Sequence, residues 1–64
     1  MPVVRINMFE GRPIELKRAL VAKVTEAVAD TLSLDKKAVT IIITEDKKDN
    51  YATDGILAID RPAK

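Results

Sequence analysis

Residues 39–45, Val-Thr-Ile-Ile-Ile-Thr-Glu, decide the fold of this chain. β-Branched residues fill almost the whole segment, which predicts a β-strand. Around Ile41, Ile42 and Ile43 the strand is apolar on both faces, so both faces need to be covered. One helix can cover only one face. The other face therefore requires a different partner.

The segment before this strand, residues 14–32, predicts a long amphipathic helix. Pro13 suits the first turn of a helix, where its missing N–H would have no intrahelical partner, and Glu15 lies near the positive end of the helix dipole. The expected apolar face has spacings of mostly three and four residues and consists of Leu16, Leu20, Val21, Val24, Ala27, Val28, Thr31 and Leu32.

Residues 3–9 predict a first strand that ends at Glu10-Gly11. Its side chains alternate between two faces, with Val4, Ile6 and Met8 on one and Val3, Arg5, Asn7 and Phe9 on the other. Strand, helix and strand in this order predict a βαβ crossover with parallel strands, an α/β (α+β) unit.

The rest of the chain is expected to add little regular structure to a single domain of residues 1–64. Residues 46–54 predict a polar loop, and the short apolar segment 55–59 predicts a short C-terminal strand or hairpin, or a segment that docks on a neighbour. Residues 60–64 resemble a frayed tail.

The composition points to self-association. A chain of 64 residues is marginally stable alone, and without Cys or His it has no disulfides and no usual zinc ligands. Its 47% hydrophobic content with only one Phe and one Tyr leaves more aliphatic side chains than a lone βαβ unit can cover. A homo-oligomer is the simplest solution.

Charge and hydropathy exclude several function classes. The net charge of +1 comes from both signs spread along the chain, without the basic stripe and stacking aromatics of a nucleic-acid binder. No apolar run is long enough to span a membrane, and no segment resembles an export signal. We therefore expect a cytoplasmic protein that binds neither nucleic acid nor membrane.

The amino terminus is the candidate for proton chemistry. Without His or Cys, the α-amino group is the only group type in the chain with an ordinary pKa near neutrality, about 7.7–8.0. Removal of Met1 would expose the secondary amine of Pro2. The alternative interpretation is that proline stands at this position only as a small residue that permits that removal. Arg12 could lower the pKa of this amine or bind a substrate carboxylate, or it could be a surface residue at a helix start. The carboxylates of Glu45, Asp46, Asp49 and Asp54 are expected to be solvated.

Three features together make the chain resemble the 4-oxalocrotonate tautomerase family over nearly its whole length: Pro2 opening a strand, Glu10-Gly11-Arg12 before a long helix, and a second strand ending in Ile-Ile-Thr-Glu. The resemblance implies βαβ subunits that pair into dimers with a shared four-stranded sheet and assemble into hexamers, as trimers of dimers. It also implies an isomerase that needs no metal or organic cofactor and acts on a small carboxylate substrate, a 2-hydroxydienoate or an enolpyruvate.

The resemblance assigns roles to four residues of this chain. Pro2 matches the general acid/base, Arg12 matches an arginine that binds the substrate carboxylate, and Tyr51 takes the place of a pocket aromatic that is usually phenylalanine. Thr40 is the main departure, because it stands where the best-known members carry a second arginine. A hydrogen bond to a charged group contributes about 1.5–3 kcal/mol, so this loss predicts poor turnover of a dicarboxylate. Candidate replacement cations are Arg5, Lys36, Lys37 and Arg61.

Two alternatives remain beside the tautomerase. Thr40 favours a noncatalytic oligomeric protein that binds a small molecule in the same pocket. A related hydratase or dehalogenase of haloacrylates would need a group that activates water, and the expected loop carboxylates do not provide a convincing one. We rank the tautomerase first, the binding protein second and the hydratase third.

Overall fold

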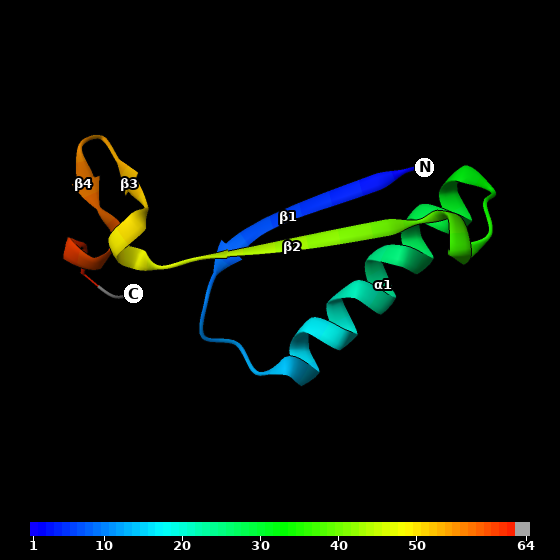
Figure 1. Ribbon diagram of the computed structural model, residues 1–64, viewed down its shortest axis with the longest axis horizontal. Coiled ribbons are helices and arrows are strands. Elements are labelled where there is room, and N and C mark those ends of the chain that lie inside the picture. The colour runs from blue at the N-terminus through cyan, green and yellow to red at the C-terminus, as the bar shows by residue number, and fades with distance from the viewer. Residues whose placement is uncertain (63–64) are drawn as a thin grey trace.

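The structure, a computed structural model, describes residues 1–62 and has a βαβ unit as its body (Figure 1). Its elements are β1 (Val3–Phe9), α1 (Ile14–Leu32) and β2 (Thr40–Asp46), and β1 and β2 form a parallel pair. This confirms the predicted fold class and the extent of the long helix. Ala63 and Lys64, the end of the predicted tail, lie outside the described residues.

The strand register shows which side chains of β1 and β2 share each face of the sheet. The pairing runs from Val3 opposite Thr40 to Phe9 opposite Asp46, and paired residues of parallel strands point to the same side. The face toward α1 is half-buried at Val4, Ile6, Met8, Ile41 and Ile43. The other face is exposed at Arg5, Asn7, Thr40, Ile42 and Thr44. Among residues 1–62, no element covers this second face of the sheet.

Helix α1 follows an extended Pro13 and ends at Ser33, which adopts a left-handed conformation (φ 57°) and donates its backbone N–H to Ala29. Leu20, Val21, Val24 and Val28 are half-buried, but Leu16 and Leu32 of the predicted apolar face remain 55% and 56% exposed. Ala29 is the only fully buried hydrophobic residue in the described part of the chain. No helix within residues 1–62 is long and apolar enough to cross a membrane.

Strand β2 begins and ends one residue later than the sequence predicted. The short 3-10 helix η1 (Lys36–Ala38) precedes it, capped by the Asp35 side chain, and the Val39 N–H closes that turn by donating to the Lys36 carbonyl. Val39 therefore belongs to the turn. At the other end Asp46 pairs with Phe9, so the strand continues one residue beyond Glu45.

The C-terminal segment, residues 47–62, forms a hairpin arm, which confirms the predicted C-terminal strand or hairpin. Its elements are η2 (Lys48–Asn50), β3 (Ala52–Thr53), β4 (Ile56–Leu57) and η3 (Ala58–Asp60). Asp54 and Gly55 both have positive φ, 57° and 75°, as a type I′ hairpin turn requires. The predicted loop thus contains β3, and the predicted strand 55–59 is limited to β4. Arg61, in the predicted tail, donates its guanidinium to the Thr53 carbonyl at 2.8 Å.

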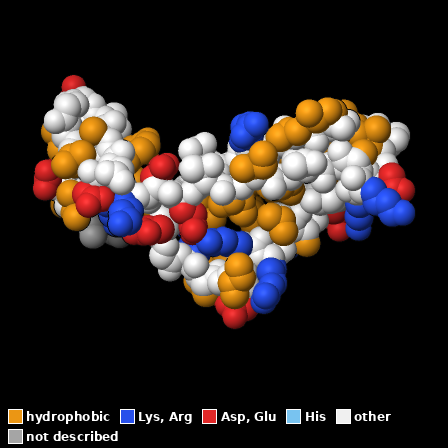
Figure 2. Space-filling model, in the orientation of Figure 1, with side chains coloured by type: hydrophobic (Ala, Val, Ile, Leu, Met, Phe, Trp, Pro, Cys, Tyr) orange, Lys and Arg blue, Asp and Glu red, His pale blue; other side chains and the backbone are white. Residues whose placement is uncertain are grey.

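The hairpin arm projects from the body, so the chain is extended (Figure 1). Its radius of gyration is 15.0 Å, against about 11 Å for a compact domain of this length. Hydrophobic side chains lie at the surface along β1 and over the arm (Figure 2), where Ile56 and Ile59 are 43% and 59% exposed. Exposure on this scale agrees with the expected self-association.

Candidate active site

Pro2 and Thr40 lie together at one end of the β1–β2 pair. The Thr40 backbone N–H donates to the Pro2 carbonyl at 3.0 Å, and Pro2 is half-buried. Met1 is 93% exposed and still precedes Pro2, so the Pro2 nitrogen is an amide in this form of the chain. Two of the candidate replacement cations, Lys36 and Lys37, belong to η1 just before Thr40.

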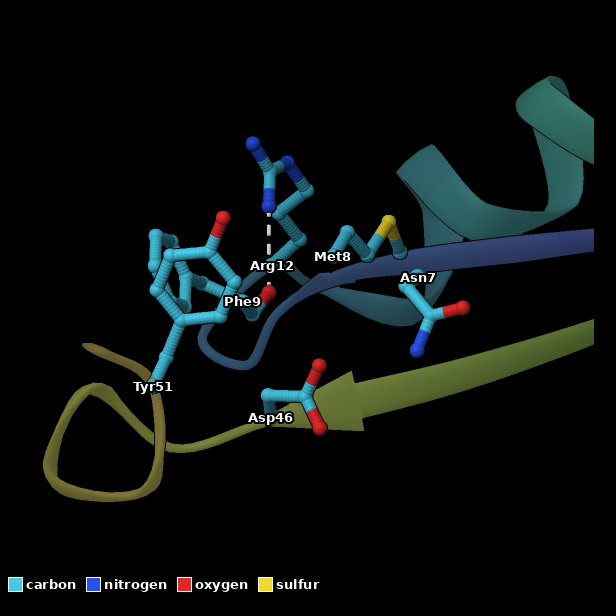
Figure 3. Close-up of a pocket in the computed structure, with 6 residues that line it drawn as sticks. All are labelled: Asn7, Met8, Phe9, Arg12, Asp46 and Tyr51. Atoms are coloured by element: carbon cyan, nitrogen blue, oxygen red, sulfur yellow. Dashed lines mark hydrogen bonds between the residues drawn. The ribbon is translucent and has the colours of Figure 1, made fainter. Parts of the chain in front are cut away.

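A pocket of about 330 Å³ lies at the opposite end of the pair, where β1, the loop before α1, the end of β2 and the arm meet (Figure 3). This volume is within the range of small-molecule sites. Its lining residues are Asn7, Met8, Phe9, Arg12, Asp46 and Tyr51. Arg12 and Tyr51, both predicted as substrate-binding residues, therefore share one pocket.

The backbone conformation of Gly11 and a hydrogen bond to the Phe9 carbonyl position Arg12 at this pocket. Gly11 has φ 118°, which glycine adopts at little cost, and redirects the chain between β1 and α1. The Arg12 side chain then donates from Nη1 to the Phe9 carbonyl at 3.1 Å (Figure 3). No other residue among 1–62 accepts a hydrogen bond from this guanidinium, so its remaining donors can hold a planar carboxylate.

Tyr51 forms the aromatic wall of the pocket together with Phe9. The two rings meet edge to face, with centroids 5.1 Å apart and an interplanar angle of 85°. The Tyr51 carbonyl accepts a hydrogen bond from the Ala58 N–H at 2.7 Å, which links the two sides of the arm. The sequence analysis did not identify Phe9 as a site residue. The sequence feature that could have identified Phe9 is its position at the end of the first strand, on the face away from the helix.

The expectation that Glu45 and Asp46 are both solvated loop carboxylates was wrong. Both residues lie in β2, on opposite faces. Glu45 forms a 2.7 Å salt bridge with Lys17 of α1, while Asp46 is half-buried and lines the pocket beside its pairing partner Phe9. The register of β2 against β1 places Asp46 at the pocket. The residues next to Asp46 in the sequence do not predict this position.

The structure divides the four predicted site residues into two pairs. Pro2 precedes β1, whereas Arg12 and Tyr51 lie beyond its other end. The intervening seven residues of β1 span about 23 Å at the usual rise of a strand. One chain therefore does not bring Pro2 to the Arg12 pocket.

Comparison with known proteins agrees with this fold. The family model described as tautomerase enzyme matches residues 2–58. A 2-hydroxymuconate tautomerase from Bacillus subtilis strain 168 is 47% identical over 55 residues, which cover 86% of this chain and 89% of the relative.

Two solved structures are similar over almost the whole chain. YwhB, a homologue of 4-oxalocrotonate tautomerase, superposes with a TM-score of 0.89 at 43% identity and covers 95% of this chain and 100% of its own. A heterohexamer 4-oxalocrotonate tautomerase from Chloroflexus aurantiacus J-10-fl has a TM-score of 0.87 at 30% identity, covering 94% of this chain and 97% of that one. The region that the family model matches includes β1, α1, β2, the pocket arginine and the arm as far as residue 58, and on these grounds the chain belongs to the tautomerase family, whose members are isomerases.

Proposed function

We propose that the protein is a cofactor-independent tautomerase that moves a proton within a 2-hydroxydienoate or an enolpyruvate. The observation that carries this proposal is the pocket in which the free guanidinium donors of Arg12 lie beside the Phe9–Tyr51 ring pair. Arg12 would bind the carboxylate of the substrate, and the rings would cover its apolar part. Pro2, with Met1 removed, would supply the base.

The active site is shared between two copies of the chain. If two β1 strands pair edge to edge about a two-fold axis, they run antiparallel, and the Pro2 end of one strand lies beside the pocket end of the other. This arrangement makes the four-stranded sheet that the family resemblance implies. The exposed arm and uncovered sheet face support further association, and we propose a hexamer built as a trimer of dimers.

In the proposed reaction the neutral Pro2 nitrogen takes the proton from the enol hydroxyl of the substrate. The electron pair shifts along the conjugated system, and the prolinium returns the proton to a carbon, so that the product is an isomer with every atom retained. Arg12 holds the carboxylate and stabilises negative charge that develops during the transfer. The apolar ring pair lowers the local dielectric, which favours the neutral amine.

Thr40 supports the second candidate, a noncatalytic protein that binds a small carboxylate. Its side chain is exposed at the Pro2 end and offers a hydroxyl where a cation would stabilise the reacting substrate. In that case Arg12 and the rings would bind ligand without turnover. Activity measurements separate the two candidates directly.

The test uses protein whose mass confirms removal of Met1. Ultraviolet spectra follow the ketonisation of phenylenolpyruvate and 2-hydroxymuconate by wild type, Pro2→Ala and the matched control Pro62→Ala. A general base contributes about 10²–10⁴ in rate, so Pro2→Ala should lose at least about a hundredfold while Pro62→Ala stays near wild type. Full activity in Pro2→Ala, with unchanged assembly, would refute the proposal. An inactive but ligand-binding wild type would favour the second candidate.

A further inference from the structure

Asp46 is an acidic residue in the pocket to which the proposed mechanism gives no role. It pairs with Phe9 across the parallel strands, and its carboxylate lies on the same side of the pair as the Asn7 amide (Figure 3). Its backbone carbonyl accepts from the Glu10 N–H at 3.0 Å. Within residues 1–62 no group donates a hydrogen bond to the carboxylate itself.

No cation within residues 1–62 forms a salt bridge with this carboxylate. Lys17 is paired with Glu45, on the helix side of the sheet, and this is the one salt bridge within residues 1–62. Arg12 lines the same pocket as Asp46, but its hydrogen bond goes to the Phe9 carbonyl. The pocket therefore presents one cation and one separate anion to a ligand.

We infer that Asp46 determines specificity by excluding a second carboxylate, so that the pocket selects monocarboxylates whose far end is uncharged. This inference rests on the proposed function, because it takes Arg12 as the site of the first carboxylate. A ligand held there by one carboxylate brings its far end into a pocket of about 330 Å³ that also contains the Asp46 oxygens. Like charges at such short range repel, and repulsion of this kind discriminates between ligands more sharply than added attraction.

The kinetic test compares Asp46→Asn with wild type on two matched substrates. These are 2-hydroxymuconate, a dicarboxylate, and 2-hydroxy-2,4-pentadienoate, which lacks the second carboxylate. Asp46→Asn should raise kcat/KM about tenfold for the dicarboxylate and less than about twofold for the monocarboxylate. Asp49→Asn is the control, since it removes the same charge from an exposed position in a separate groove. Equal changes for both substrates, or the same selectivity shift in the control, would overturn the inference.

Ionic strength provides a readout that a purely structural role of Asp46 would not move. Raising it from about 0.01 to 1 M shortens the screening length from about 30 to 3 Å. Wild type should then accept the dicarboxylate relatively better, while the ratio of the two kcat/KM values in Asp46→Asn stays constant. A salt dependence that is the same in both proteins would contradict direct repulsion by Asp46.

Binding of unreactive ligands keeps this test independent of catalysis. Adipate and hexanoate match in length and differ by one carboxylate, and isothermal titration calorimetry measures their affinities. The fluorescence of Tyr51, the only tyrosine in a chain without tryptophan, reports whether the ligand reaches the pocket. Asp46→Asn should tighten adipate about tenfold and leave hexanoate unchanged.

The two sets of results separate the inference from the proposed function. If wild type is inactive but Asp46→Asn selectively tightens adipate, the tautomerase proposal fails and the role of Asp46 stands. If Pro2→Ala abolishes activity but Asp46→Asn leaves the ratio of the affinities for adipate and hexanoate unchanged, the tautomerase proposal stands and the proposed role of Asp46 fails. Failure of both proteins to bind either ligand counts against the role of Asp46.

Discussion

Two inactive variants should restore each other if the active site is shared between copies. Pro2→Ala removes the proposed base. Arg12→Ala removes the side chain proposed to bind the substrate carboxylate and should lower the rate about tenfold to a hundredfold. Because about 23 Å of β1 separates the two positions, each site in the proposed dimer would take Pro2 from one copy and Arg12 from the other. A mixed dimer then contains one doubly damaged site and one intact site.

The expected recovery follows from random pairing. When the two variants are denatured, mixed in equal amounts and refolded, half of the dimers are mixed and half of their sites are intact. Activity toward phenylenolpyruvate should therefore reach about a quarter of the value of refolded wild type. Each variant refolded alone is the control.

A different result would be equally informative. If Pro2 and Arg12 of the same chain formed the site, every chain in the mixture would carry a lesion, and the mixture would show only the average of the two separate variants. That outcome, in mixtures shown by mass spectrometry to contain mixed oligomers, would refute the shared site.

The other predictions concern catalysis at two positions and stability at two. Thr40→Arg restores a cation and should raise kcat/KM for 2-hydroxymuconate by about tenfold to a hundredfold; no gain would show that Thr40 does not limit dicarboxylate turnover. Tyr51→Phe keeps the edge-to-face ring contact and should retain kcat/KM within about twofold, whereas Tyr51→Ala should lower it about twofold to tenfold. Gly55→Ala has free space around the new methyl group but keeps φ at +75°, so the free energy of unfolding in urea should fall by about 1 kcal/mol. Lys17→Met breaks the salt bridge to Glu45, whose side chains are 24% and 29% exposed, and should lower the same free energy by about 0.5 kcal/mol, with a smaller effect at high salt.

The sequence alone predicted the body of the molecule because its elements depend on local spacing. Apolar residues three and four apart specify a helix, and alternation over 3–9 specifies a strand, whatever the rest of the chain does. The same spacing predicted that one face of the sheet would lack cover. Element boundaries were less certain, and Val39 was assigned to a strand because its β-branched side chain gives no sign of the hydrogen bond that closes η1.

The hairpin arm was only partly predictable. Asp54-Gly55 is a strong hairpin signal, yet the flanking strands have two residues each, too few to show an alternating pattern. Hydrogen bonds within the arm stabilise it, including the one from Arg61 to Thr53, and no periodic pattern of the sequence reveals them.

Tertiary structure alone decided the composition of the pocket and the separation of its proposed partners. Asp46 contacts the site because the register of β2 against β1 places it opposite Phe9, and a shift of one residue would turn it toward the helix. Register depends on the hydrogen bonds between β1 and β2 and on the packing of α1 against one face of that pair, and no local sequence pattern reveals either. The same geometry keeps Pro2 away from Arg12, since a strand is straight and rises about 3.3 Å per residue. The sequence by itself therefore determined which residues are candidates for the chemistry, and the tertiary structure determined that one chain holds the proposed base and the proposed carboxylate-binding arginine at opposite ends of β1.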